Sequence, residues 1–237
     1  MTTLLLFDID GTLITTGGAG YRAIKQAVEM TLGVEHALEG IPVAGRTDSI
    51  ILRDAVKALD GRELDDQLRD RLRETYMTTL RAEIDRVRGG PGVLPGVRPL
   101  LARLANHPDF HVALLTGNFS QTAEIKLAYF DLWQDFAWGA FGEDAVHRND
   151  LLAVAMTRYR ARTGLDVAPA DIVIIGDTPN DAEVALAGGA RSVCVATGQF
   201  DRQALLDAGA DVVFHDLSDV DEVVRVFQDK GAPRPAP

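Results

Sequence analysis

Cysteine, long apolar runs and positive charge are all scarce in this chain of 237 residues. Its one cysteine, Cys194, lies inside the apolar stretch SVCVA, which excludes a disulfide framework and a cysteine-based zinc cluster and indicates a small core side chain. No apolar run approaches the ~18 residues of a membrane span, and the N-terminus lacks the basic segment of a signal peptide. We therefore expect a cytoplasmic protein that has no membrane partner.

The shortage of positive charge bears on the kind of partner. A formal net charge of −11 argues against binding to a nucleic-acid backbone, which needs clustered lysine and arginine. An acidic chain is better suited to a cation and a small substrate, and an anionic substrate would require local positive charge in its site. No metal-ligand spacing is shared by the five histidines, His36, His107, His111, His147 and His215. The oligomeric state, monomer or homodimer, stays open.

Short apolar runs recur along the chain and indicate the fold class. These runs are LLLF, VALL, IVII, SVCV and DVVF, and each precedes a polar or glycine-containing loop and then a helix-like stretch. Apolar runs of this length without polar alternation are typical of strands buried on both faces, and the intervening helices imply parallel pairing. The sequence therefore predicts an α/β protein with a parallel sheet.

The alternation is interrupted after the first predicted strand. Helical patterns cover residues 20–32, 48–59 and 63–88, without an intervening strand pattern. The run GGPGVLPG, residues 89–96, holds four glycines and two prolines and predicts a linker back to the sheet. We expect an all-helical insertion between the first and second strands.

These patterns give a domain division. We predict an α/β core formed by residues 1–15 and 96–228 and a helical domain at residues 16–95. The proline-rich residues 229–237 are predicted to be a disordered tail.

Carboxylates follow two of the predicted strands. In LLLFDIDGTL, Asp8 and Asp10 end the first strand, and since residues two apart point to the same side, both can face one site. In GDTPND, Asp177 and Asp181 end another strand, with Pro179 suited to begin a helix. Ligands of open parallel sheets bind at this carboxyl edge. So many carboxylates need a counter-charge, and Mg²⁺ is the divalent cation that such ligands favour.

The tripeptide TGN, residues 116–118, follows the second predicted strand of the core. A threonine hydroxyl, backbone N–H groups freed by glycine, and an asparagine amide would form a neutral cradle for an anion such as phosphate. The alternative for TGN by itself is an ordinary turn that caps the next helix.

The motifs DIDGT, TGN and GDTPND, in this order, resemble those of the haloacid dehalogenase superfamily. The helical block resembles that superfamily's C1-type cap, and the overall pattern is similar to its phosphoglycolate phosphatase-like members. The resemblance implies a three-layer, Rossmann-like α/β core with an inserted all-helical cap domain.

The resemblance also implies roles for the acids. Asp8 would attack the phosphoryl group and form an aspartyl-phosphate. Asp10 would protonate the leaving oxygen and later deprotonate the water. Asp8, the backbone carbonyl of Asp10, and Asp177 would hold Mg²⁺, while Asp181 would order the waters of the metal or the loop.

Further residues are implied to contact substrate. Thr116 and Asn118 would bind phosphoryl oxygens. Additional candidates for substrate contact near the motifs are Gly11, Thr12 and Gly117. In the cap, Arg46 of the loop GRTD is a candidate anion partner, and the alternative is a solvated or helix-capping arginine.

One residue departs from the superfamily pattern. The lysine usually found before the helix that precedes GDxxxD, where it neutralises the nucleophile, is missing. That region, GEDAVHRNDLLAVA, offers Arg148, and the helix after TGN offers Lys126; the flexible ammonium slightly favours Lys126. The alternatives are that Lys126 is a surface lysine and that Arg148 pairs at the surface with Glu143 or Asp144.

The expected function is Mg²⁺-dependent hydrolysis of a small phosphorylated metabolite. The acid at Asp10 favours phosphate esters over a halide substrate, whose leaving group needs no proton. Two alternatives stay open: a phosphosugar mutase with the same core motifs, and a non-catalytic binding module on this fold.

Overall fold

A computed structural model describes residues 2–86 and 92–229. Within these ranges, six parallel strands form one sheet in the order β3-β2-β1-β4-β5-β6. The strands are β1 (Thr3–Phe7), β2 (Phe110–Leu115), β3 (Gly139–Ala140), β4 (Ile172–Gly176), β5 (Arg191–Val195) and β6 (Val212–Phe214). β1 is central and pairs with β2 on one side and β4 on the other.

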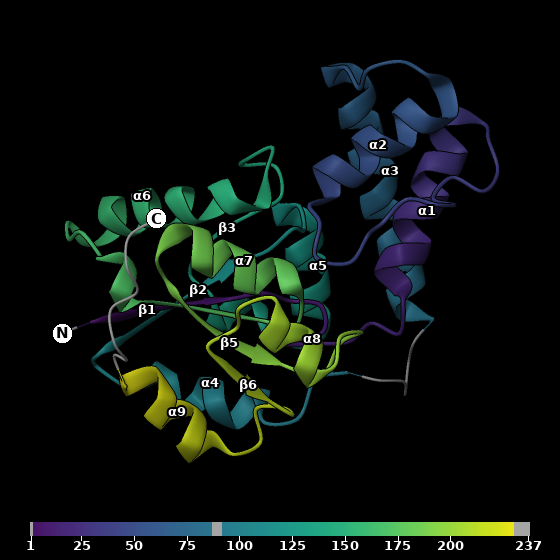
Figure 1. Ribbon diagram of the computed structural model, residues 1–237. Helices are drawn as coiled ribbons and strands as arrows, with labels where there is room; N and C mark the ends of the chain where they lie inside the picture. Colours follow the sequence, from purple (N-terminus) through teal and green to yellow (C-terminus); the bar gives the residue numbers. More distant parts are fainter. Residues whose placement is uncertain (1, 87–91, 230–237) are drawn as a thin grey trace.

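Helices cover both faces of the sheet (Figure 1). One face packs on α4 (Val97–Ala105), α9 (Val220–Gln228) and part of α5 (Ser120–Tyr129), around Phe7 and Phe227. The other face packs on α6 (Leu151–Thr163) and α7 (Pro179–Gly188). The short α8 (Arg202–Asp207) packs near β5 and β6. β1 has the apolar residues on both faces that a central parallel strand requires.

Three helices between β1 and α4 form a separate group (upper right in Figure 1). They are α1 (Ala19–Leu32), α2 (Asp48–Asp60) and α3 (Asp66–Asp85), and they share an apolar core that includes Leu52, Leu72 and Phe119. Phe119 comes from the start of α5, so this core reaches the sheet domain. We call the three helices and their connecting loops the cap.

The two connections between sheet and cap run side by side. Ile14 and Val93 form an antiparallel bridge, and the N–H of Leu94 donates to the carbonyl of Leu13 at 3.0 Å. This pairing ties the entry and exit of the cap together close to the end of β1.

The predicted sheet and helices are present in the described residues, with two differences. β3 has two residues and was not predicted. α3 begins at Asp66 rather than at residue 63, because the side chain of Asp65 accepts from the N–H of Leu68 and caps the helix there. Residues 87–91 of the predicted helix and linker, and residues 230–237 of the predicted tail, lie outside the described residues. Among described helices, none is both long and apolar enough to cross a membrane.

Candidate active site

The predicted acids meet at the carboxyl edge of the sheet. Asp8 directly follows β1 and Asp177 directly follows β4. The N–H of Asp8 donates to the carbonyl of Ile175 in β4 at 2.8 Å, which holds the ends of the two strands together. Pro179 begins α7 as predicted, which places Asp181 in the first turn. Oxygens of Asp8, Asp177 and Asp181 lie within 4.8 Å of one another, and all three residues are buried.

Burial makes this acid cluster electrostatically costly. Burial, opposed by Arg148 and assisted by Asp181, raises the pKa of Asp8 to about 6. Burial raises the pKa of Asp177 to about 8, and the neighbouring Asp181 and Asp8 add to the shift. Burial therefore disfavours the ionised form of these carboxyl groups unless a cation lies near them. A hard divalent cation with oxygen ligands fits this set of donors.

Asp181 differs from the other two acids in its partners. Its Oδ2 accepts from the N–H (3.1 Å) and the hydroxyl (2.7 Å) of Thr178, which forms a capping box at the start of α7. Its Oδ1 accepts from Nη2 of Arg148 at 2.5 Å. Both oxygens are thus already engaged by the protein, and Asp181 orders the loop between β4 and α7.

Arg148 lies against the nucleophile candidate. It precedes α6 in a short 3₁₀ turn and is buried, with Nη2 3.1 Å from Oδ2 of Asp8 and Nη1 3.1 Å from the carbonyl of Gly45. Burial lowers its pKa, but Asp181 and Asp8 raise it further, so the guanidinium stays charged. Its buried Nε has no hydrogen-bond partner among the described residues.

Lys126 lies against the other motif aspartate. This α5 residue is buried, and its Nζ lies 2.6 Å from Oδ2 of Asp10 and 2.6 Å from Oδ1 of Asn118. The amide of Asn118 donates to Asp10 (3.0 Å) and to Oγ1 of Thr116 (2.8 Å). The Asp10 side chain is still 42% exposed, so it is held by Lys126 and Asn118 while remaining open to solvent.

These positions separate the two cation candidates. Arg148 contacts Asp8, and Lys126 contacts Asp10. The surface alternatives for both residues are wrong because both side chains are buried. The acids considered as surface partners of Arg148 pair elsewhere: Glu143 with Arg73 at 2.8 Å and Asp144 with Arg158 at 2.5 Å.

Glycines allow the chain to approach these acids closely. A Cβ on Gly11, whose φ is +77°, would lie 2.2 Å from Oδ2 of Asp177. A Cβ on Gly198 would lie 1.7 Å from the same atom. The neighbouring Thr12 points its hydroxyl at Oδ1 of Asp177 (3.4 Å). Larger residues at either glycine would displace Asp177.

The cap contacts the site directly through the loop GRTD and the start of α2. The carbonyl of Gly45 accepts from Arg148 and from Nδ2 of Asn180 (2.6 Å), and a Cβ on Gly117 would lie 2.3 Å from the carbonyl of Arg46. The N–H of Asp48 donates to the carbonyl of Gly117 at 2.7 Å. The cap is therefore closed over the carboxyl edge.

Asp48 is a buried acid that joins the cap to α5. Its Oδ2 accepts from the N–H of Phe119 (3.0 Å) and the hydroxyl of Thr122 (3.2 Å). Burial raises its pKa to about 6, against the lowering effect of Lys126. Sequence reasoning did not single out Asp48, although its place at the end of GRTD, before a helix, was an available signal.

We expect Asp48→Ala to lower the free energy of unfolding by about 1–3 kcal/mol, because two buried donors lose their acceptor. Asp48→Asn keeps an acceptor oxygen and is expected to lose less. Because the folded-state pKa is raised from 3.8 to about 6, the folded protein binds the extra proton, and wild-type stability falls as pH rises through this window. Urea unfolding at pH about 5 and about 7.5 measures this. Equal pH dependence in wild type and Asp48→Asn would contradict it.

Cap and sheet edge enclose a cavity of about 390 Å³. It is lined by Asp8, Asp10, Lys126, Arg148 and Asp177, together with residues of the cap. Arg46 also lines it, but its Nη2 pairs with Asp54 (2.5 Å) and its Nη1 donates to the carbonyl of Pro42 (3.1 Å). Thr197 and Gly198, after β5, complete the edge and were not predicted; their position after a fourth apolar run was the available signal.

The structure thus combines a parallel α/β core, an aspartate cluster at its carboxyl edge and a cap above that edge. Residues 5–186 match the haloacid dehalogenase-like hydrolase family, and the chain belongs to that family. This confirms the resemblance inferred from the three motifs.

Individual relatives are more distant. The chain is 24% identical to the phosphoglycolate phosphatase of Nitrosospira multiformis, over 93% of this chain and 95% of that protein. It is also 24% identical to the bifunctional riboflavin kinase/FMN phosphatase of Arabidopsis thaliana, over 93% of this chain, and spans 55% of the length of that protein. A hydrolase from Pseudomonas syringae superposes with a TM-score of 0.67 at 22% identity, covering 95% of this chain and 99% of that one. This structural similarity supports the fold.

Proposed function

We propose that this protein is a Mg²⁺-dependent phosphatase that hydrolyses a small phosphate monoester through an aspartyl-phosphate on Asp8. The observation that carries the proposal is the difference in environment between Asp8 and Asp10 at the carboxyl edge of the sheet. Asp8 is buried against a permanent cation, whereas Asp10, two residues away, is open to the cavity and held by a lysine and an amide. Two carboxylates in different environments suit two different roles.

Asp8 is the proposed nucleophile. Its carboxylate oxygen would attack phosphorus, forming a P–O bond to the enzyme while the bond from phosphorus to the leaving oxygen breaks. Arg148 holds the Asp8 side chain and would bring positive charge to the phosphoryl group. Gly117 and Asn118 of the TGN segment line the same cavity, and Thr116 is a hydrogen-bond partner of Asp8; together they would bind the other oxygens.

Asp10 is the proposed acid and base. It would protonate the leaving oxygen in the first step and take a proton from the attacking water in the second, which releases phosphate and restores Asp8. The contacts from Lys126 and Asn118 fix the Asp10 side chain at 2.6 and 3.0 Å, so that it faces the cavity. Cap closure would exclude bulk water during the first step.

Asp8, Asp177 and the backbone carbonyl of Asp10 would hold Mg²⁺. When bound, Mg²⁺ supplies the positive charge that the acid cluster needs and neutralises the phosphoryl oxygens. Asp181, whose oxygens are engaged by Thr178 and Arg148, would support the metal loop from outside.

The proposal predicts metal-dependent phosphate release. We expect purified protein to release inorganic phosphate from some members of a panel of phosphorylated metabolites with Mg²⁺, and to lose at least about 100-fold of that rate in EDTA. Adding Mg²⁺ back is the control for irreversible damage. Interconversion of sugar phosphates without phosphate release would indicate a mutase instead. Silence in both assays, with affinity for a ligand retained, would indicate a binding module.

A further inference from the structure

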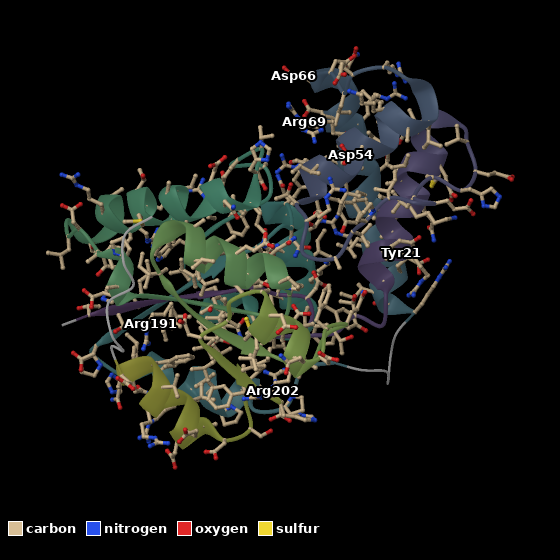
Figure 2. The ribbon with its side chains drawn as sticks, viewed as in Figure 1. Tyr21, Asp54, Asp66, Arg69, Arg191 and Arg202 are labelled. Carbon is tan, nitrogen blue, oxygen red and sulfur yellow. The ribbon has the colours of Figure 1, made fainter. Side chains whose placement is uncertain are left out.

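The cap side of the cavity differs sharply from the aspartate side. Much of its wall is formed by apolar and aromatic side chains from the three cap helices, the loop before α2 and the loop after β5: Tyr21, Ile24, Val43, Ile51, Tyr76 and Phe200. Arg46 and Asp48 of the cap also line this side. Figure 2 shows Tyr21 at the end of α1 nearer the sheet domain. The alcohol part of a phosphate ester bound at Asp8 would lie against this wall.

Every cation that lines the cavity, in the part of the chain that the structure describes, already has a carboxylate partner. Lys126 is 2.6 Å from Asp10, and Arg148 is 2.5 Å from Asp181. Arg46, the cap residue expected from sequence to pair with an anion, is 2.5 Å from Asp54. The hydrogen bond from Arg46 lowers the pKa of Asp54, so that carboxylate remains ionised and the pair persists.

A second negative charge on the substrate would therefore weaken its binding in this cavity. It would lose its hydration, find its possible partners occupied, and lie near Asp10 and Asp48. The phosphoryl group itself differs, because it would lie at the proposed metal, whose charge would add to that of Arg148.

The size of the cavity and the polarity of its wall indicate which alcohol part of a substrate would fit. A cavity of about 390 Å³ is much larger than a phosphate group with a one- or two-carbon alcohol requires. Tyr76, a residue that is 2% exposed, lines the cavity. Burial raises the pKa of Tyr76, so it remains a neutral donor. A buried neutral hydroxyl suits an uncharged oxygen of a ligand.

We propose that the substrate is the phosphate monoester of an uncharged alcohol with a substantial apolar or aromatic body, and that esters with a second anionic group are rejected. This inference rests on the proposed phosphatase function. It predicts that this chain hydrolyses phosphoglycolate poorly, although the chain is similar to a protein named phosphoglycolate phosphatase.

The test compares kcat/KM for benzyl phosphate, 4-carboxybenzyl phosphate, ethyl phosphate and 2-phosphoglycolate. Acetyl phosphate, a small acyl phosphate with a good leaving group, serves as a reference substrate. We expect benzyl phosphate to exceed both its carboxylated analogue and ethyl phosphate by at least about 10-fold. Equal or faster hydrolysis of 4-carboxybenzyl phosphate, or of phosphoglycolate over ethyl phosphate, would overturn the inference alone. If neither acetyl phosphate nor any of the four monoesters is hydrolysed, the proposed function itself fails.

Asp54→Asn tests the cause of the rejection. Figure 2 places Asp54 on the cap, and its side chain is one-third exposed, so the substitution is compatible with folding. Release of Arg46 is expected to raise kcat/KM for 4-carboxybenzyl phosphate by about 5-fold or more and to leave benzyl phosphate unchanged. Glu63→Gln, the same change of charge at the exposed Lys57–Glu63 pair of the cap, should alter neither value. Equal effects of the two variants would refute the role given to Arg46.

Discussion

Asp8→Asn is expected to lower kcat by about 10⁴-fold or more, because the amide cannot form the aspartyl-phosphate that carries the reaction. The substitution preserves the shape of a side chain that is buried against Arg148 at 3.1 Å. Phosphate release at saturating Mg²⁺ measures the loss. In acid-quenched wild type, mass spectrometry should find phosphate on Asp8, and in the variant on no residue. Phosphate found on another residue would contradict the proposed nucleophile.

Asp177→Asn is the matched control, since it makes the same change at the neighbouring acid. Asp177 is proposed to hold the metal rather than to attack phosphorus, so higher Mg²⁺ should recover part of the activity of this variant. No concentration of Mg²⁺ should rescue Asp8→Asn. Equal rescue of both variants would show that Asp8 acts only as a metal ligand.

Unfolding of Asp8→Asn would also abolish activity, so its thermal stability must be compared with that of wild type. Without metal, three buried acids face one arginine in this cluster, and burial has raised the pKa of Asp8 to about 6. Removing one of the acids relieves like-charge repulsion. We therefore expect the Tm of Asp8→Asn in EDTA to equal or exceed that of wild type.

The sheet and the acid cluster were predictable for the same reason. Strands buried on both faces need uninterrupted apolar runs, and the carboxyl ends of parallel strands meet at one edge, so Asp8 and Asp177 were expected at the same edge once their runs were recognised. That β1 and β4 are direct neighbours comes from the structure. β3 gave no such signal, because Gly139–Ala140 is too short for an apolar run. Its two residues are strand only through pairing with β2.

The cation positions could not be predicted, because they depend on contacts between distant segments. Arg148 contacts Asp8, whereas the acids near it in sequence, Glu143 and Asp144, pair with Arg73 and Arg158. The burial of Asp48 likewise depends on the cap resting on the start of α5. Local sequence contains the charges but not the pairing.

Arg148→Met is expected to lower kcat/KM by about 10²–10³-fold, because Asp8 and the phosphoryl group lose their neighbouring cation. The decrease should be similar for an alkyl phosphate and for an aryl phosphate, which has a better leaving group, since the nucleophile attacks phosphorus in both reactions. Arg148→Lys, which restores the residue usual in the superfamily, should recover most of the activity. It would still lose the contact to the carbonyl of Gly45 that connects site and cap.

Lys126→Met provides the contrast that separates the two cations. Lys126 contacts Asp10, not Asp8, so its removal should disturb protonation of the leaving oxygen. We expect kcat/KM to fall by about 10²-fold for the alkyl ester, whose leaving group needs the proton, and by less than about 10-fold for the aryl ester. Because kcat/KM reports the first chemical step, later hydrolysis of the phosphoenzyme does not mask the difference. If both variants show the same dependence on the leaving group, the two cations do not act on separate aspartates. The assignment of Asp8 as nucleophile and Asp10 as acid and base would then be wrong.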